Sequence, residues 1–172
     1  MGFATGDPSI KISAPFVLHP GTRVTVTEPG NAKWIYIPLP LCKGDLITGI
    51  SVLYNKSDIS TDIAQVRVVE QGSPTSATVV HSWKTNCEAT GVLTLNSSCK
   101  VEVKTSVLLN LCLDFAGAAG MIELGAVEIR YIPEYTLPEV ENESSLPFSK
   151  IRKIGKSRHL QARLPEFLFF KT

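Results

Sequence analysis

The 172-residue chain lacks the features that define several classes of protein. No run approaches the roughly 18 consecutive apolar residues that a membrane-spanning helix needs. The N-terminus, MGFATGDPSIKIS, has no apolar core of the kind a secretory signal contains, and Gly6 stands where a myristoylation motif has Ser or Thr. The sequence therefore predicts a protein that is cytoplasmic or associated with a virion or similar particle.

Charge is also scarce. Charged residues make up 19% of the chain, below the roughly 25% of an average soluble domain. The net charge is +1, so the molecule as a whole has no field that would select nucleic acid or an acidic ligand. So little charge is typical of a surface partly covered by a neighbouring subunit, and we expect a homo-oligomer or a larger assembly.

Catalytic motifs are missing as well. The three histidines are scattered, and the chain contains no H-E-x-x-H, Gly-x-Ser-x-Gly or glycine-rich phosphate loop. Asp114, in the apolar run VLLNLCLDF, is expected to be partly buried and to accept bonds from backbone amides of the following AGAAG turn. We predict no catalytic residue, no metal, no cofactor and no enzymatic activity. An enzyme whose site lies on an unrecognised loop is kept as a third hypothesis, after the structural and the saccharide-binding hypotheses given below.

The four cysteines form no C-x-x-C pair, so neither a zinc site nor a redox motif is indicated. Cys42 and Cys112 adjoin apolar runs and are expected to be buried free thiols. Cys87 and Cys99 bracket a short predicted strand. In an oxidising compartment these two would be able to pair, and the sequence leaves that question open.

Alternation with a period of two is the dominant pattern. Runs such as TRVTV, IAQVRVVE and MIELGAVEIRYI alternate apolar and polar residues, and turn residues separate about nine of them, with GVLTL and KVEV counted as two strands. The alternation predicts inward faces for Tyr54 in one run and for Ala64 and Val66 in the next. No convincing helix interrupts residues 1–132. So many strands bury their apolar faces only as two packed layers. We predict an all-β, two-sheet antiparallel sandwich with an extended C-terminal arm, jelly-roll-like rather than immunoglobulin-like because the loops are long.

A polar loop, NKSDISTD at residues 55–62, interrupts two of these runs. Calcium would accept its oxygen atoms, but the loop lacks the ordered acidic spacing and the glycine of a dedicated calcium loop. Asn, Ser and Asp also favour turns, because their side chains bond nearby backbone groups. We therefore expect a plain connection between strands. Its oxygen-bearing residues are Asn55, Ser57, Asp58, Ser60, Thr61 and Asp62.

The run IYIPLPLCKGDLITGISVLYNKSD, followed by IAQVRVVE, resembles small β-sandwich modules of bacterial and phage-type surface and structural proteins. GMIELGAVEIRYIP is similar to the last strand of such modules. The resemblance covers residues 34–70 and 121–133, and its motifs are structural. It implies a sandwich fold and a non-enzymatic role, with no reaction attached. The cationic C-terminal arm departs from the pattern.

Aromatic residues on the strands form one candidate binding site. Flat apolar rings with polar edges suit saccharides, so a carbohydrate-binding module is the alternative function. Alternating aromatics in strands more often fill a core or pack at an edge, which ranks this alternative second. The candidate saccharide contacts are Trp34, Tyr36, Tyr54 and Trp83.

The composition changes after Ile132. PEYTLPEVENESSLP is typical of an extended linker, and residues 144–172 carry seven Lys or Arg side chains against Glu166 alone. We predict a sandwich domain over residues 1–135 and a linker with a basic arm over 136–172. The arm suits docking on a neighbouring subunit, and contact with nucleic acid or an anionic membrane is not favoured. The candidate assembly or anion contacts are Lys150, Arg152, Lys153, Lys156, Arg158, Phe167, Phe169 and Phe170.

The primary functional prediction combines these points. We expect a non-enzymatic structural or attachment protein that self-assembles through its β-sandwich and its C-terminal arm.

Overall fold

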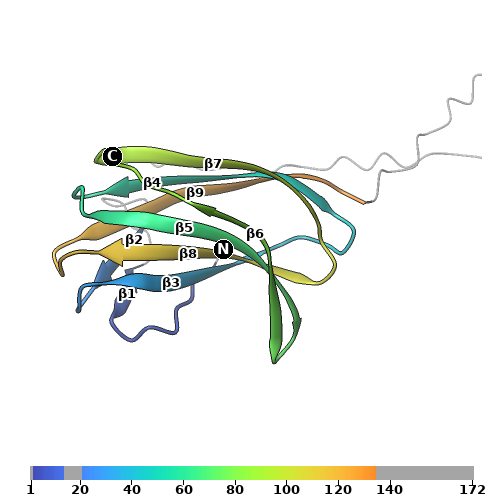
Figure 1. Ribbon diagram of the computed structural model, residues 1–172, viewed down its shortest axis with the longest axis horizontal. Coiled ribbons are helices and arrows are strands. Elements are labelled where there is room, and N and C mark those ends of the chain that lie inside the picture. Colours follow the sequence, from blue (N-terminus) through green and yellow to red (C-terminus); the bar gives the residue numbers. More distant parts are fainter. Residues whose placement is uncertain (1, 14–20, 135–172) are drawn as a thin grey trace, which may run out of the picture. The chain divides into compact units, whose positions relative to one another are not determined.

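A computed structural model describes residues 2–13 and 21–134 of the chain. These residues form nine β-strands that pack as two layers (Figure 1). No helix in the described ranges is long and apolar enough to cross a membrane. The strands are β1 (Ile10–Ser13), β2 (Thr22–Val26), β3 (Gly30–Leu39), β4 (Leu46–Lys56), β5 (Thr61–Ser73), β6 (Ser76–Lys84), β7 (Gly91–Glu102), β8 (Ser106–Phe115) and β9 (Met121–Ile132).

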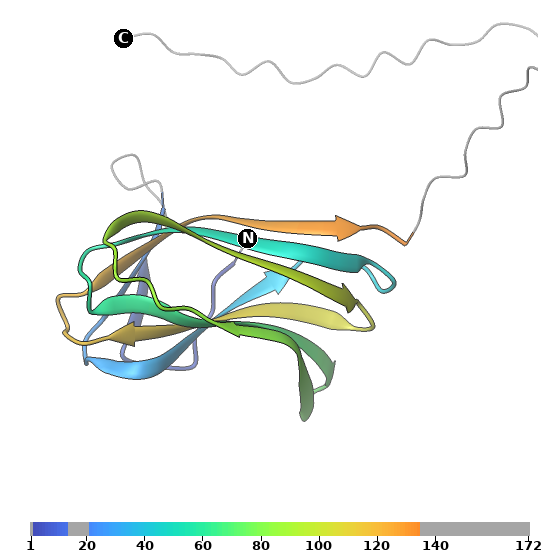
Figure 2. The same cartoon turned by 45° about the horizontal axis from the view of Figure 1, so that its top comes forward.

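The strand order is that of a jelly roll. One sheet has the order β1-β2-β9-β4-β7 and the other β3-β8-β5-β6, with every pair antiparallel. From β2 onward the chain changes sheet at each connection except the β5–β6 hairpin, which stays in one sheet and projects from the body (Figures 1 and 2). Eight strands wound in this way form two nested Greek keys. The predicted all-β jelly-roll sandwich is confirmed.

Alternation along the strands fills the space between the sheets. In β8 the apolar residues Val107, Leu109, Leu111, Leu113 and Phe115 are all buried, at 0–3% exposure. The intervening residues of β8 face outward. The same alternation in β3 and β4 completes a single core that both sheets share. At roughly 25 cal/mol per Å² of apolar surface, burial of this kind is the main source of stability in a sandwich.

Three details differ from the sequence-based expectation. GVLTL and KVEV were expected to form separate strands, but they belong to one strand, β7. In β5 a bulge between Ile63 and Gln65 shifts the register, so Ile63 and Val66 face the core, and Ala64 does not continue the inward row. Cys42, expected to be buried, is exposed.

The two cysteines that were candidates for pairing lie far apart. Cys99 Sγ is 3.9 Å from the Ile47 carbonyl oxygen, near the start of β4. The Cys87 carbonyl instead accepts a bond from Lys56, at the end of the same strand. Nine residues of extended chain separate Ile47 from Lys56, about 30 Å at 3.3 Å per residue, whereas disulfide-bonded Cα atoms lie within roughly 7 Å.

Candidate functional site

The outer surface of the four-stranded sheet carries a group of aromatic and planar polar side chains. Strand pairing places Trp34 of β3 beside Cys112 of β8, and Cys112 beside Gln65 of β5. The next outward row consists of Tyr36, Asn110 and Arg67. We call these two rows the Arg67 face. Its half-buried members are Trp34, Tyr36, Gln65, Arg67 and Asn110.

The strand that carries the two aromatic rings is held at its outer edge. The backbone of Ala4 pairs with Tyr36, with N···O distances of 3.0 and 2.8 Å, and Thr5 Oγ1 donates to the Trp34 carbonyl. This short N-terminal segment occupies backbone groups that an edge strand otherwise leaves open. The spacing of Trp34 and Tyr36 is therefore fixed by backbone pairing on both sides of β3.

Arg67 is held by contacts with Trp34 and Gln65. Its guanidinium carbon lies 4.4 Å from the centre of the Trp34 ring, which is a cation–π contact. One Nη donates to Gln65 Oε1 at 2.9 Å, and Gln65 Nε2 donates to Ser82 Oγ of β6 at 2.8 Å. The chain of contacts holds the guanidinium over the sheet, so one face of Trp34 is covered by Arg67.

Asn110 lies between Tyr36 and Arg67 in the second row. Its Oδ1 atom is shielded from solvent and has no hydrogen-bond partner among the described residues. A shielded acceptor without a partner lowers stability by roughly 1–3 kcal/mol. Beside it, burial raises the pKa of the Cys112 thiol, and the neighbouring Asp114 adds to that shift. Cys112 therefore remains a neutral thiol beneath the face, as predicted for a buried cysteine.

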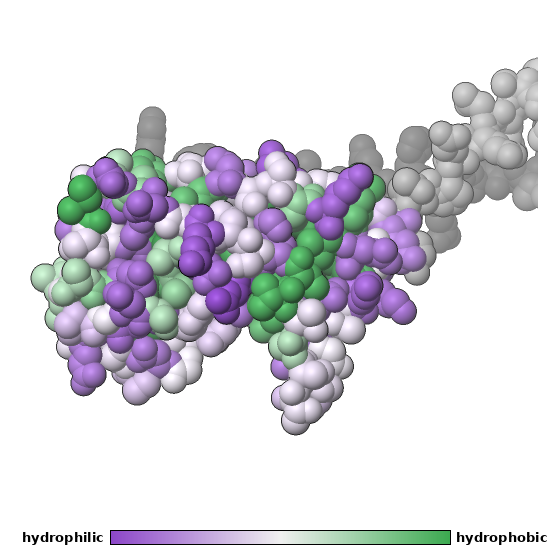
Figure 3. Space-filling model, viewed as in Figure 1, coloured by the Kyte–Doolittle hydropathy of each residue, from purple (hydrophilic) through white to green (hydrophobic). Residues whose placement is uncertain are grey.

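A third outward row next to these two is apolar. Strand pairing aligns Pro38, Leu108, Val69 and Val79, and Val79 is 50% exposed. In the space-filling view, a hydrophobic band lies close to the projecting β5–β6 hairpin, beside mixed polar and apolar surface (Figure 3). The face thus offers aromatic, hydrogen-bonding and aliphatic surface side by side.

The other two aromatic candidates do not join this face. Tyr54 is 1% exposed and belongs to the core, so it has no ring surface open to a ligand. Trp83 is paired with Val66, on the inner side of β6, and packs against the core beside His81 at a ring distance of 5.2 Å. The candidate set from sequence is corrected accordingly: Trp34 and Tyr36 share one outer surface, and Tyr54 and Trp83 serve the interior.

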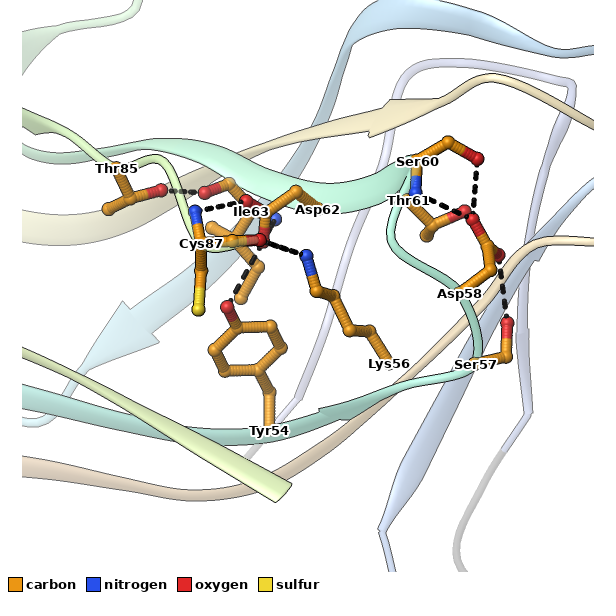
Figure 4. A network of polar contacts seen from close by, with 10 residues as sticks. All are labelled: Tyr54, Lys56, Ser57, Asp58, Ser60, Thr61, Asp62, Ile63, Thr85 and Cys87. Carbon is orange, nitrogen blue, oxygen red and sulfur yellow. Dashed lines mark hydrogen bonds and ion pairs between the residues drawn. The ribbon is translucent and has the colours of Figure 1, made fainter. Parts of the chain in front are cut away.

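A second polar group, which we call the Asp62 cluster, links β4 of one sheet to β5 of the other and to the segment between β6 and β7 (Figure 4). Its members are Tyr54, Lys56, Asp62 and Cys87. Asp62 Oδ1 accepts from the Tyr54 hydroxyl at 3.0 Å and lies 3.4 Å from Lys56 Nζ, whose side chain is fully buried. Asp62 Oδ2 accepts from the Cys87 amide at 3.0 Å. Lys56 Nζ also donates to the Cys87 carbonyl at 2.5 Å.

The chemistry of the Asp62 cluster is structural. Asp62 accepts from the backbone N–H of Cys87, and Lys56 donates to the backbone C=O of the same residue. Cys87 lies in the segment that crosses from β6 to β7. Burial, followed by the charge of Asp62, raises the pKa of the Tyr54 phenol, which keeps it a hydrogen-bond donor. Every member of the cluster is satisfied within the fold.

The loop between β4 and β5 turns the chain between the two sheets. The Asp58 carboxylate accepts from the Ser60 amide at 3.0 Å, the Ser60 hydroxyl at 2.6 Å, the Thr61 hydroxyl at 2.9 Å and the Ser57 hydroxyl at 3.1 Å. The Ser60 hydroxyl contributes most to lowering the pKa of Asp58. Asp58 and Asp62 thus serve different partners, and within residues 2–13 and 21–134 no three His, Cys, Asp or Glu side chains gather as a metal site requires.

Asp114 has a different partner from the one expected. Its Oδ1 accepts from the Ala32 amide at 2.9 Å, across the sheet, in place of the amides of the following turn. Ala32 has a positive φ of 59°, a conformation that a non-glycine residue adopts only with support from its surroundings. The carboxylate therefore stabilises the irregular start of β3, where the register shifts between Gly30 and Lys33.

Sequence reasoning missed the polar half of the Arg67 face. Gln65, Arg67 and Asn110 become neighbours of Trp34 only through the pairing of β3, β8 and β5, which no local pattern specifies. A usable signal was present: Asn110 is a lone polar residue inside VLLNLCLDF. The basic and aromatic candidates of the arm, residues 150–170, lie outside the described residues, and the predicted domain boundary stays a prediction.

No family model matches the chain, and no curated protein sequence matches it. Several solved structures are similar to this chain, and three of them follow. One titled "CBM4 structure and function" has a TM-score of 0.46 at 11% identity, over 72% of this chain and 78% of its own. The carbohydrate-binding module CBM36, in complex with calcium and xylotriose, has a TM-score of 0.37 at 16% identity, over 76% and 100%. CBM29_1, a family 29 carbohydrate-binding module from Piromyces equi, has a TM-score of 0.41 at 13% identity, over 76% and 80%.

These findings correct the primary functional prediction. The similar solved structures are carbohydrate-binding modules, so the prediction of a self-assembling structural or attachment protein is wrong, and the saccharide alternative is the better supported of the two. The expected homo-oligomer and the contact with nucleic acid find no support. All three titles describe binding modules and none describes an enzyme.

Proposed function

We propose that this protein binds a saccharide on the Arg67 face and does so without catalysis. The observation that carries the proposal is the arrangement of the face itself. Trp34 and Tyr36 stand two residues apart on one strand, beside the guanidinium of Arg67 and the amides of Gln65 and Asn110. These planar side chains come from three adjacent strands of one sheet.

Sugar rings present two kinds of surface, and the face offers a counterpart for each. The C–H groups of a pyranose pack on aromatic and aliphatic surface, here Tyr36, the exposed edge of Trp34 and the apolar row that ends at Val79. Ring hydroxyls bond to planar groups that offer donors and acceptors in fixed directions, such as amides and guanidinium. Because strands carry the side chains, little ordering is needed on binding.

Affinity electrophoresis in gels that contain xylan, mannan, β-glucan or polygalacturonate tests the proposal with the full chain. We expect retardation by at least one polysaccharide. Tyr36→Ala and Asn110→Leu are each expected to weaken that binding about tenfold or more, as replacement of a central contact does. Tyr131→Ala is the matched control, because Tyr131 is an aromatic residue that is 47% exposed on the opposite sheet.

The pattern across variants decides the outcome. Thermal melts of each variant separate loss of binding from loss of fold. Binding that falls for Tyr36→Ala and stays unchanged for Tyr131→Ala supports the Arg67 face. Retardation by none of the four polysaccharides, or equal loss in all variants, contradicts the proposal.

A further inference from the structure

We propose that the saccharide is acidic, and that Arg67 receives a carboxylate of a uronic acid unit. This inference rests on the proposed function and narrows it to a class of ligand. Two observations support it: the N–H donors of Arg67 that have no partner among the described residues, and the charges that surround this guanidinium.

Arg67 is oriented but largely unpaired. A guanidinium has five N–H donors, and among the described residues the one hydrogen bond from Arg67 goes to Gln65 Oε1 at 2.9 Å. No carboxylate in residues 2–13 and 21–134 lies within ion-pair distance of it. Its side chain is half-buried against the sheet. An arginine fixed in place with donors to spare is suited to a ligand that brings acceptors.

The stacking of Arg67 on Trp34 favours an anion over a neutral ring. The guanidinium lies 4.4 Å from the centre of the Trp34 ring, so it occupies ring surface on which a neutral sugar would otherwise stack. Beyond this contact and the bond to Gln65, the remaining N–H donors of the guanidinium have no hydrogen-bond partner among the described residues. A carboxylate matches the edge of a guanidinium with two parallel hydrogen bonds, whereas a single hydroxyl does not.

The surrounding charges are complementary to an anion. Arg67 and Lys84 are the cations of the two rows, since Lys84 of β6 continues the row of Gln65. Asp114 is the nearest outward carboxylate on β8, and the Ala32 amide already binds it. Asp62, which pairs with Asp114 in register, turns its carboxylate toward Lys56. Asp114 keeps its charge when it accepts from a neutral amide, but among the described residues no carboxylate forms an ion pair with Arg67 or with Lys84.

Two forms of one polymer isolate the carboxylate. Polygalacturonate and its fully methyl-esterified form share a backbone and differ in charge. With the full chain at about 0.15 M salt, we expect the free acid to bind roughly tenfold or more tightly than the ester, the increment of a charge-assisted bidentate pair. Arg67→Gln should remove that preference. Arg67→Lys should keep the charge and lose most of the preference, because an ammonium lacks the planar fork.

Two controls separate this site from general attraction between charges. Lys84→Gln removes a cation of the same face and should change the preference less than about threefold, as exposed charges do. Changing Lys150, Arg152, Lys153 and Lys156 together to Gln tests the basic C-terminal segment in the same assay. We expect that variant to keep the preference for the free acid.

Each remaining result has one meaning. Equal binding of acid and ester that still depends on Tyr36 overturns the acidic class and leaves saccharide binding intact. A preference that survives Arg67→Gln, or that disappears in the C-terminal variant, overturns the role of Arg67. Equal affinity for dextran sulfate and polygalacturonate overturns recognition of the carboxylate, since it indicates charge without shape. If no polysaccharide binds at all, the proposed function itself fails.

Discussion

The Asp62 cluster and the Arg67 face are two polar groups of similar size in one sandwich, and they are built on opposite principles. In the Asp62 cluster both carboxylate oxygens have donors, from the Tyr54 hydroxyl and from the Ile63 and Cys87 amides, and Lys56 neutralises the charge. On the Arg67 face the guanidinium makes one hydrogen bond within the described chain, and Asn110 Oδ1 makes none.

The difference is consistent with the roles proposed for the two groups. Polar groups that serve the fold are paired within it, because an unpaired group away from water destabilises the folded state. Polar groups that are oriented but unpaired make the fold less stable, and their donors and acceptors are available to a ligand. Mutations should therefore affect stability in the cluster and binding on the face. Three experiments test this contrast, and a fourth measures the loop that precedes Asp62.

The largest effect is expected for Asp62→Ala. The change leaves the Lys56 ammonium buried without its counter-ion and should lower the free energy of unfolding by about 3–5 kcal/mol. Asp114→Ala is the matched control, since within the described residues this carboxylate accepts one backbone hydrogen bond, and its loss should lower the free energy of unfolding by about 1 kcal/mol. Urea denaturation measures both. Equal losses for the two variants would show that Asp62 contributes no more to the fold than a carboxylate with a single backbone hydrogen bond.

A smaller loss is expected for Tyr54→Phe. The ring stays in the core, and one hydrogen bond to Asp62 disappears while the two amide donors remain. We expect a loss of about 1 kcal/mol and no change in polysaccharide binding. A fall in binding with unchanged stability would place Tyr54 in the functional site, contrary to its burial.

Asn110→Leu should act in the opposite direction. It removes a shielded acceptor that has no partner in the described chain, so stability should rise by about 0.5–1 kcal/mol while saccharide binding falls. Calorimetry and affinity electrophoresis on the same sample provide the two readings. A stability loss above about 1 kcal/mol would show that Asn110 serves the fold.

The smallest effect concerns the loop at Asp58. Its folded pKa lies below the ordinary value of 3.8, so its contribution to stability is present above that value and is lost as the pH falls through the folded pKa. Because solvent screens this side chain, the contribution should be a few tenths of a kcal/mol. The stability difference between wild type and Asp58→Asn should shrink between about pH 5 and pH 2. If the stability difference between wild type and Asp58→Asn grows as the pH falls, the Asp58 carboxylate does not stabilise the loop.

The sequence sufficed for the layers of the fold because alternation reports which side of a strand is buried. Val66 and Tyr54 were assigned to inward faces and are 0% and 1% exposed. The bulge after Ile63 was not predictable, since a bulge depends on the partner strand and leaves no local signature. The partner of Asp114 was mispredicted for the same reason: it is a backbone amide 82 residues away in sequence.

The candidate site was half predictable. Trp34 and Tyr36 share a face by their spacing alone, and the structure places both outside. Trp83 was included with them because an aromatic residue in a strand looks the same whichever way it points. Arg67, Gln65 and Asn110 were not identified, because the order of strands in the sheet decides who their neighbours are. Strand order is a property of the whole chain and not of any window of it.

The alkylation rate of Cys112 reports how often the Arg67 face opens. The thiol lies in the row of Trp34 and Gln65 and is 6% exposed, while Cys42, on the same chain, is exposed. An alkylating reagent will consume Cys42 at the rate of a solvent-facing thiol, and it will reach Cys112 only when the side chains above it separate. The ratio of the two labelling rates, followed by mass spectrometry, thus records how often the face opens, without any attached probe.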